Sequence, residues 1–190
     1  MSPRMGITKE KIIDTAVQFV DEEGFTALTI ATLSKRLNIR PPSLYNHVSG
    51  LHEIQVAVAV KGLTMLSEEG KQVTEGLEKA DAVLAFARQY VQFVREHPGL
   101  YEAAFTHFDE KEVSAAAEHL ADFVQSMMSR FGVKEGEMTH VVRGLRSLLH
   151  GFGDISNKKG FQRKEHLEDS VSYAVRIYIA GMQQQKDLSH

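Results

Sequence analysis

The sequence predicts an all-α protein of about nine helices, and three observations support that prediction. Apolar residues recur at intervals of three and four positions along most of the chain. The alternation of apolar and polar residues that marks a half-buried strand is scarce, and only four prolines interrupt the 190 residues. Glycine, asparagine and proline stand where the helical pattern stops. We therefore expect helices joined by turns, without a β-sheet.

The first three predicted helices are short. We expect Thr8 to cap the first helix and Gly24 to end it. Thr29 caps the second helix, and Asn38 tolerates a left-handed turn after it. The third helix begins at Pro41, where the N–H that proline lacks would have no partner inside the helix.

Longer helices follow after residue 50. Their expected limits are residues 51–70, 81–96, 100–105, 111–131, 135–152 and 164–184. Residues 70–78 are rich in glycine and charge and are expected to form a connection. Because three short helices bury little apolar surface by themselves, we expect them to pack on the fourth helix. The sequence therefore predicts a small domain over residues 1–50 and a helical body over residues 51–190.

Composition excludes several classes of protein. There is no cysteine, which excludes disulfide frameworks and thiolate chemistry and suits a reducing cytoplasm. No apolar run is long enough to span a membrane, and the N-terminus leads into a polar helix rather than a signal peptide. We expect a soluble, cytoplasmic protein without a membrane partner. The net charge of −3 does not indicate nucleic-acid binding, but the stretch from Lys35 to His52 holds three cations and no acid.

The second and third helices, with the tight turn between them, have the pattern of a helix-turn-helix. Such a motif needs a second helix that enters the major groove and is polar on its outer side. The polar side chains expected there are Arg40, Ser43, Asn46 and His47. Leu44 and Val48 are expected to face the core. Asparagine pairs with adenine, and arginine pairs with guanine or phosphate. The spacing alone leaves open a small helical subdomain that binds no DNA.

Three segments carry a family resemblance: GFTALTI at residues 24–30, LSKRLNI at residues 33–39 and PSLYNHV at residues 42–48. Together they resemble the N-terminal domain of the TetR (tetracycline-repressor) family, most specifically in the Leu-Tyr-x-His-Val ending. The resemblance covers residues 8–60. It implies an all-α fold, a C-terminal body for ligand binding and dimerisation, and repression that a small molecule releases.

By this resemblance, residues 40–47 form the recognition helix. Phosphate contacts set the docking register, and they are expected from Thr29, Lys35, Arg36 and Tyr45. The full set of expected DNA-binding residues is Thr29, Lys35, Arg36, Arg40, Pro41, Pro42, Ser43, Leu44, Tyr45, Asn46, His47 and His52. The chain departs from the family at Leu51, where a phosphate-binding lysine is common. Either His52 or the N-terminus of the fourth helix replaces that lysine, or DNA binding is weaker.

The C-terminal half resembles a type of TetR regulator named for a Trp-His-Gly signature, of which only His150-Gly151 is present. An effector pocket is expected among the fourth to eighth helices, mostly apolar with a few polar groups. Its expected residues are Phe86, Tyr90, Tyr101, Phe105, His107, Phe123, Met127, His140, Arg143 and Leu145. Ordinary core packing is the alternative for each of them. Such a pocket suits a partly apolar, aromatic or fatty effector.

The last two helices are expected to form a homodimer. An apolar stripe near the chain end consists of Val171, Ala174, Val175, Tyr178, Ile179 and Met182. Such a stripe packs either in the core of its own subunit or against a second copy. By the resemblance, two helices from each subunit form a four-helix interface, and a dimer matches a palindromic DNA site.

No cofactor or metal site is expected, because the nine histidines are dispersed without the close pairs that zinc sites use. A helical enzyme stays open as an alternative, although the sequence has no Ser/His/Asp arrangement, phosphate-binding glycine loop or paired-histidine motif. An interaction module that has lost its DNA-binding face is another alternative, motivated by Leu51. The expected function is that of a ligand-responsive transcriptional repressor that binds double-stranded DNA. Its ligand is expected to shift a conformational equilibrium through the fourth helix.

Overall fold

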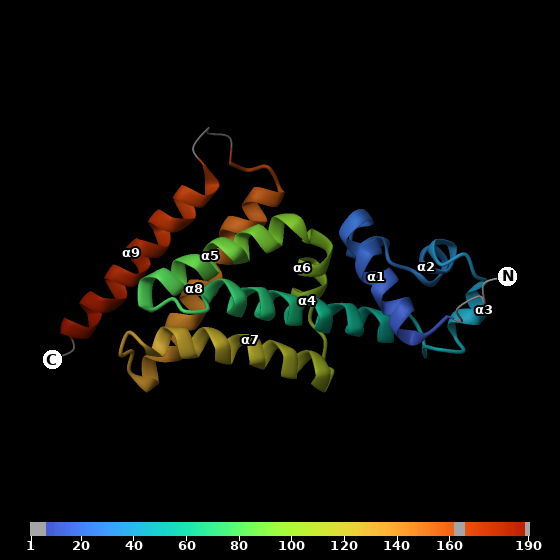
Figure 1. Ribbon diagram of the computed structural model, residues 1–190, viewed down its shortest axis with the longest axis horizontal. Coiled ribbons are helices and arrows are strands. Elements are labelled where there is room, and N and C mark those ends of the chain that lie inside the picture. The colour runs from blue at the N-terminus through green and yellow to red at the C-terminus, as the bar shows by residue number, and fades with distance from the viewer. Residues whose placement is uncertain (1–6, 162–165, 189–190) are drawn as a thin grey trace. The chain divides into compact units, whose positions relative to one another are not determined.

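Residues 7–161 and 166–188 are described by the computed structural model, and this part of the chain forms helices and no β-strand (Figure 1). The all-α prediction is confirmed. The elements are α1 (Lys9–Glu23), the 3-10 turn η1 (Phe25–Ala27), α2 (Ile30–Arg36), α3 (Pro41–Leu44), α4 (Leu51–Thr74), α5 (Lys79–Glu96), α6 (Pro98–Phe105), α7 (Lys111–Ser129), α8 (Glu135–Asn157) and α9 (Leu167–Leu188). A predicted helix start at Lys164 lies outside the described residues. Among the described helices, none combines the length and the apolar character needed to cross a membrane.

The chain divides into two compact units. The first holds the chain up to Leu63 and the segment His97–Ala116, and the second holds Thr64–Glu96 and the chain from Ala117 onward. Helices α4 and α7 each begin in the first unit and end in the second. The first compact unit extends beyond residue 50, because α6 and the first part of α4 belong with the three N-terminal helices.

Helix α1 has the ends that the sequence predicts. Thr8 caps it by accepting a hydrogen bond from the N–H of Lys11 at 3.3 Å. Gly24 follows the helix with a φ of 89°, a value that residues with a side chain rarely adopt. The residues that α1 buries recur at helical spacing and are Ile12, Ala16, Phe19 and Val20.

Helix α6 packs on α1 through an unusually close backbone contact. A Cβ atom on Gly99 would lie 1.8 Å from the carbonyl oxygen of Val20, so only glycine allows this approach. The carboxylate of Asp21 accepts a hydrogen bond from the N–H of Leu100 at 3.3 Å, and its other oxygen lies 2.6 Å from Nδ1 of His97. Asp21 therefore satisfies a free N–H in the first turn of α6 and places a negative charge at the positive end of that helix.

In the second unit, α5 packs against α8 and α9 (Figure 1). The Nε of Arg88 donates to the hydroxyl of Ser172 at 3.0 Å, which links α5 to α9. The hydroxyl of Tyr178 donates to the carbonyl oxygen of Val141 at 2.5 Å, which links α9 to α8. The buried residues of α5 are Ala82, Val83, Leu84, Phe86, Ala87, Tyr90, Val91, Phe93 and Val94.

The apolar stripe predicted near the chain end lies on α9. Its residues Val171, Val175 and Ile179 are buried within their own subunit, so core packing accounts for this part of the stripe. Helix α9 also exposes two large apolar side chains that the predicted stripe does not contain. These are Tyr173 and Ile177, with exposed fractions of 70% and 56%.

Three helices extend past their predicted ends: α4, α8 and α9, the last of which continues to Leu188. Helix α4 includes Gly70 and continues to Thr74, because this glycine packs in the interior instead of ending the helix. A Cβ atom on Gly70 would lie 2.9 Å from ring carbons of Phe86. Helix α8 continues to Asn157, whose side-chain amide donates to the carbonyl oxygen of Val94 at 2.9 Å.

Replacing Gly99 by alanine is expected to destabilise the protein by about 2–4 kcal/mol, because the added methyl group overlaps the α1 backbone. Gly136→Ala in α8 is the matched control, since nothing lies within 4 Å of the Cβ added there. That substitution is expected to be neutral or slightly stabilising, because alanine favours the helix. Urea denaturation measures both variants, and equal stability of the two would contradict the close contact of α6 with α1.

Candidate DNA interface

Thr29 caps α2, as predicted, and the structure shows that the cap is reciprocal with Thr32. Oγ1 of Thr29 accepts a hydrogen bond from the N–H of Thr32 at 3.0 Å, and Oγ1 of Thr32 accepts one from the N–H of Thr29 at 2.9 Å. The side chain of Thr29, a predicted phosphate contact, is therefore already engaged. After α2, Asn38 has a φ of 54°, and the N–H of Ile39 donates to the carbonyl oxygen of Ser34 at 3.0 Å. The predicted left-handed turn is confirmed.

The recognition segment, residues 40–47, is only partly helical. Its helix α3 is a single turn, Pro41–Leu44, and residues 45–47 continue it as a turn. The N–H groups of His47 and Val48 both donate to the carbonyl oxygen of Leu44, at 2.9 and 3.1 Å. The chain turns tightly at this shared acceptor, so the regular helix is shorter than the predicted residues 40–47.

Two apolar side chains anchor the recognition segment. Leu44 is fully buried and Val48 is almost fully buried, as their predicted core orientation requires. The burial of Leu44 corrects its place among the predicted DNA-binding residues, because a side chain without exposed surface cannot reach a base edge. Leu44 instead fixes the position of its neighbours, and α3 packs against α2.

The other side chains of the recognition segment face outward. Ser43 is half-buried, and the exposed residues are Arg40, Pro41, Pro42, Tyr45, Asn46 and His47. A guanidinium, a phenol, an amide and an imidazole therefore belong to one short surface segment that contains no acid. These groups supply the hydrogen-bond donors and acceptors that base edges and phosphates require.

The basic side chains predicted to bind phosphate differ in whether an acidic residue already pairs with them. Lys35 is exposed and forms no ion pair with the residues that the structure describes. Arg36 is paired with Glu22, with 2.5 Å between Nη2 and the carboxylate. His52 is exposed but is paired with Glu110, which lies between α6 and α7. Arg36 and His52 therefore already have acidic partners, whereas Lys35 has none among the described residues.

Glu53 is a structural residue of this site that the sequence analysis missed. Its carboxylate accepts hydrogen bonds from the N–H and the hydroxyl of Ser49 at 2.6 and 2.8 Å, and it forms an ion pair with Lys9. These partners, Lys9 first, lower the pKa of Glu53 to about 2. The contacts fix the start of α4 directly after the recognition segment. A serine shortly before a helix and a glutamate in its first turn resemble a capping box, which is the signal that could have identified the pair.

The predicted effector residues fall in both compact units. Tyr101, Phe105 and His107 belong to the first unit, and the rest belong to the second. The rings of Tyr101 and Phe105 pack with 4.6 Å between their centroids. His107 is almost fully exposed and lies 3.1 Å from the carboxylate of Asp109. No group of three metal-binding side chains occurs within residues 7–161 and 166–188.

Three predicted effector residues form an aromatic cluster in the second unit. The ring of Phe86 lies edge-on to Tyr90 and to Phe123, with centroid distances of 6.0 and 5.5 Å. Gly70 of α4 lies against this cluster, since a Cβ added there would meet Phe86 at 2.9 Å and Phe123 at 3.1 Å. The glycine makes room for the two rings.

The remaining predicted effector residues of the second unit divide by burial. Met127 and Leu145 are buried, whereas His140 and Arg143 are exposed on α8. Ser67 of α4 is a polar residue that the sequence analysis did not select. Its hydroxyl is buried and has no hydrogen-bond partner in the described part of the chain. Ser67 is therefore the buried polar group of this region that a ligand could satisfy.

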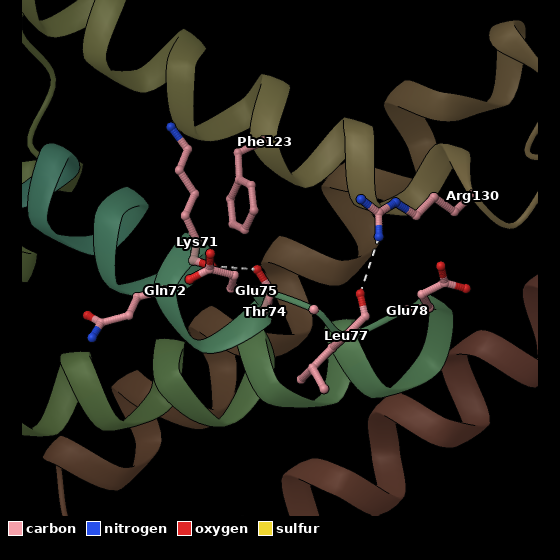
Figure 2. A pocket seen from close by; sticks show the side chains of 9 residues that line it. Lys71, Gln72, Thr74, Glu75, Leu77, Glu78, Phe123 and Arg130 are labelled. Carbon is pink, nitrogen blue, oxygen red and sulfur yellow. Dashed lines mark hydrogen bonds between the residues drawn. The ribbon is translucent and has the colours of Figure 1, made fainter.

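A groove of about 600 Å³ opens at the C-terminal end of α4. Its lining residues are Lys71, Gln72, Thr74, Glu75, Gly76, Leu77, Glu78, Phe123 and Arg130. Figure 2 shows Phe123 of α7 projecting toward Lys71 and Glu75, and Arg130, which directly follows α7, projecting toward Leu77. Nη1 of Arg130 donates to the carbonyl oxygen of Leu77 at 3.3 Å. Phe123 contributes both to this groove and to the buried aromatic cluster.

Glu53→Gln is expected to lower stability at neutral pH by about 1 kcal/mol, because the amide cannot replace the ion pair and both hydrogen bonds. The pKa of Glu53 is lowered to about 2 from an ordinary value of 4.5, so its contribution exists above pH 4.5 and disappears as the pH falls toward 2. Urea denaturation between neutral pH and pH 3 should therefore show a smaller loss for the variant than for the wild type. Glu22→Gln, which removes an exposed ion pair, is the control and should change stability little. Parallel pH profiles for Glu53→Gln and the wild type would contradict this role.

Comparison with known proteins agrees with these observations. The family model described as "Tetracyclin repressor-like, C-terminal domain" matches residues 83–178. The chain is 40% identical over 185 residues to the uncharacterised HTH-type transcriptional regulator YobS of Bacillus subtilis, and the match covers 96% of each chain. The solved structure of the regulator SCO7222, a TetR from Streptomyces coelicolor, shares the fold with a TM-score of 0.76 at 17% identity, over 94% of this chain and 99% of that one.

A TetR variant from Acinetobacter baumannii AYE, solved in complex with minocycline, has the same fold. Its TM-score is 0.70 at 15% identity, over 95% of this chain and 98% of that one. The structural neighbours show the fold, and the family model together with the Bacillus relative shows the family. The chain belongs to the TetR family of DNA-binding transcriptional regulators, which are not enzymes.

Proposed function

We propose that the protein is a ligand-responsive repressor that binds a palindromic operator as a homodimer and is released by a small molecule. The observation that supports this proposal is the burial pattern at the recognition segment, where buried apolar side chains hold the segment in place and exposed polar side chains are available to DNA. Leu44 and Val48 are buried, Ser43 is half-buried, and the other polar side chains of the segment, Arg40, Tyr45, Asn46 and His47, are exposed. Because the anchors hold the segment in place before DNA arrives, little conformational freedom is lost on binding.

Within the recognition segment, different side chains suit different parts of the DNA. Arg40 and Asn46 have the donor and acceptor patterns that read guanine and adenine in the major groove. The exposed hydroxyl of Tyr45 and the cation of Lys35 suit phosphate contacts that set the register. Arg36 is expected to contribute less, because its ion pair with Glu22 must first be exchanged.

Arg40→Ala and Tyr45→Ala are each expected to weaken binding to the intergenic DNA upstream of the gene by about fivefold or more, as loss of a base or phosphate contact predicts. Tyr45→Phe, which keeps the ring, separates the hydroxyl contact from ring packing. Arg36→Ala is the comparison variant and should cost about twofold or less, because its guanidinium is already paired. Gel shifts at low salt measure all four variants. If neither Arg40→Ala nor Tyr45→Ala changes the affinity, the interaction-module alternative replaces the repressor proposal.

The homodimer is proposed to form through α8 and α9. The exposed side chains of Tyr173 and Ile177 stand one turn apart on α9, and large exposed apolar groups of this kind mark association surfaces. A Cβ added at Gly181, one turn further along, would meet nothing within 4 Å, so the backbone there is open to a close neighbour. Two-fold symmetry would present two recognition segments to the two halves of a palindrome.

Ile177→Asp is expected to convert the dimer into a monomer, because it places a charge within an apolar interface. Gln183→Asp, an exposed position on another side of α9, is the control and should remain dimeric. Sedimentation velocity measures the oligomeric state, and the monomeric variant should also bind the upstream DNA more weakly. A variant that sediments as the wild type does would show that α9 does not form the interface through Ile177.

The effector is proposed to bind in the second unit near the aromatic cluster. Phe86 and Phe123 supply apolar surface, and the unpartnered hydroxyl of Ser67 supplies a polar group. The groove is the proposed entrance to the cluster, because Phe123 lines the groove and also packs against Phe86. Apolar surface with few polar groups suits a partly apolar, aromatic or fatty molecule.

Release from DNA is proposed to follow from a shift between two conformations. Helix α4 carries His52 of the predicted DNA-binding set in the first unit and continues to Ser67 and Gly70 in the second, so it is the proposed connection between the DNA interface and the effector region. An effector changes the equilibrium only if it binds the two conformations with different affinities. Aromatic and fatty compounds that raise the melting temperature should therefore also release the upstream DNA in the gel shift. A confirmed binder that leaves the DNA affinity unchanged would contradict this mechanism.

A further inference from the structure

His52, near the start of α4, is held by the segment that joins α6 to α7. Its Nε2 is paired with a carboxylate oxygen of Glu110. Its ring lies against that of Phe108, with 5.9 Å between the centroids. Phe108 in turn contacts Phe25 edge-on at a centroid distance of 6.5 Å. All four residues belong to the first compact unit.

This contact engages a residue that could take the place of the phosphate-binding lysine expected at Leu51 from the family resemblance. His52 and the N-terminus of α4 are the two alternatives for that contact, and His52 offers a ring N–H for it. The side chain of His52 is 66% exposed, so solvent and DNA can both reach it. In the free protein, however, its ring nitrogen is bound to an acid rather than available to a phosphate.

The Glu110 carboxylate is only partly satisfied in this arrangement. Its side chain is 31% exposed, and its second oxygen, Oε2, is buried without a hydrogen-bond partner among the described residues. The hydrogen bond from His52 lowers the pKa of Glu110, so the carboxylate stays ionised. A buried oxygen without a partner weakens the net stabilisation that the ion pair provides. The pair is therefore suited to exchange.

We propose that Glu110 is a positioning residue that withholds His52 from the DNA backbone, so that DNA binding transfers His52 from the Glu110 carboxylate to a phosphate. This inference rests on the proposed DNA interface. Phosphate and carboxylate are both anionic oxygen acceptors, so they compete for the same ring nitrogen. The number of phosphates that the protein contacts then depends on whether Glu110, an acid outside the helix-turn-helix, is paired with His52.

A purely structural role for Glu110 makes a different prediction. If the ion pair only attaches the segment between α6 and α7 to the first unit, removing the acid loosens that segment without adding a DNA contact. If the negative charge near DNA acts only by general repulsion, its removal strengthens binding whether or not His52 is present. Competition for His52 requires that any gain in affinity depend on His52.

The experiment compares the wild type, Glu110→Gln, His52→Gln and the double variant on the upstream duplex and on a mixed-sequence duplex of equal length. Fluorescence anisotropy is measured over a series of salt concentrations at about pH 6, below the ordinary histidine pKa of about 6.5. Asp109→Asn is the matched control, because it removes a neighbouring acid that pairs with His107 and not with His52.

Glu110→Gln is expected to bind both duplexes about threefold to tenfold more tightly, with a salt dependence steeper by about one phosphate contact. The double variant should lose this gain and bind no more tightly than His52→Gln. His52→Gln alone should bind more weakly than the wild type, with a shallower salt dependence, because the phosphate contact of His52 is removed. Asp109→Asn should change the affinity by less than about twofold, because it alters only the long-range electrostatic interaction with DNA. Should Glu110→Gln fold poorly, Glu110→Asp keeps the charge, shortens the side chain and should show part of the gain.

Two results overturn this inference while leaving the proposed interface intact. One is a gain that persists in the double variant, which would indicate general repulsion. The other is an affinity and salt dependence of Glu110→Gln that match those of Asp109→Asn, which would indicate a structural role alone. Absence of salt-dependent DNA binding by the wild type is a third, distinguishable result, and it would overturn the proposed interface and this inference together.

Discussion

The approach of α6 to α1 at Gly99 is the contact on which the first compact unit depends. Because the two backbones touch there, the Asp21 carboxylate reaches the first turn of α6. The segment that follows α6 then returns to the start of α4, where Phe108 and Glu110 contact His52. His52, a proposed DNA contact, is therefore connected to α6 by contacts within one unit, beyond those of the helix-turn-helix itself.

Electrostatics around the recognition segment depend on which cations are already paired. The chain carries a net charge of −3, so nonspecific attraction to DNA from the whole protein is weak. Arg36 and His52 each have an acidic partner close to the interface, whereas Lys35 and Arg40 have none among the described residues. Binding should consequently depend on a few well-placed groups, and the exchange of individual ion pairs should change it measurably.

Sequence reasoning identified the features that depend on neighbours in the chain. The Thr29 cap, the left-handed Asn38 and the inward orientation of Leu44 follow from local hydrogen bonding and helical periodicity. The approach of Gly99 to α1 and the pairing of His52 with Glu110 join residues far apart in the sequence, and periodicity carries no information about such distances.

The absence of information about long-range contacts in the sequence also explains which predictions for α9 and for the effector residues were incomplete. A helical apolar pattern identified the buried side of α9 but not a second apolar surface formed by Tyr173 and Ile177. Choosing pocket residues by type selected Phe86 and Phe123, which do pack together, and overlooked the buried hydroxyl of Ser67.

The proposal that the recognition segment binds DNA is tested most directly by comparing amide NMR shifts of the isotope-labelled protein with and without its upstream duplex. We expect the large changes to lie within residues 29–52 and around Glu110, the partner of His52. Changes concentrated in the second unit would instead show that DNA does not bind at the recognition segment.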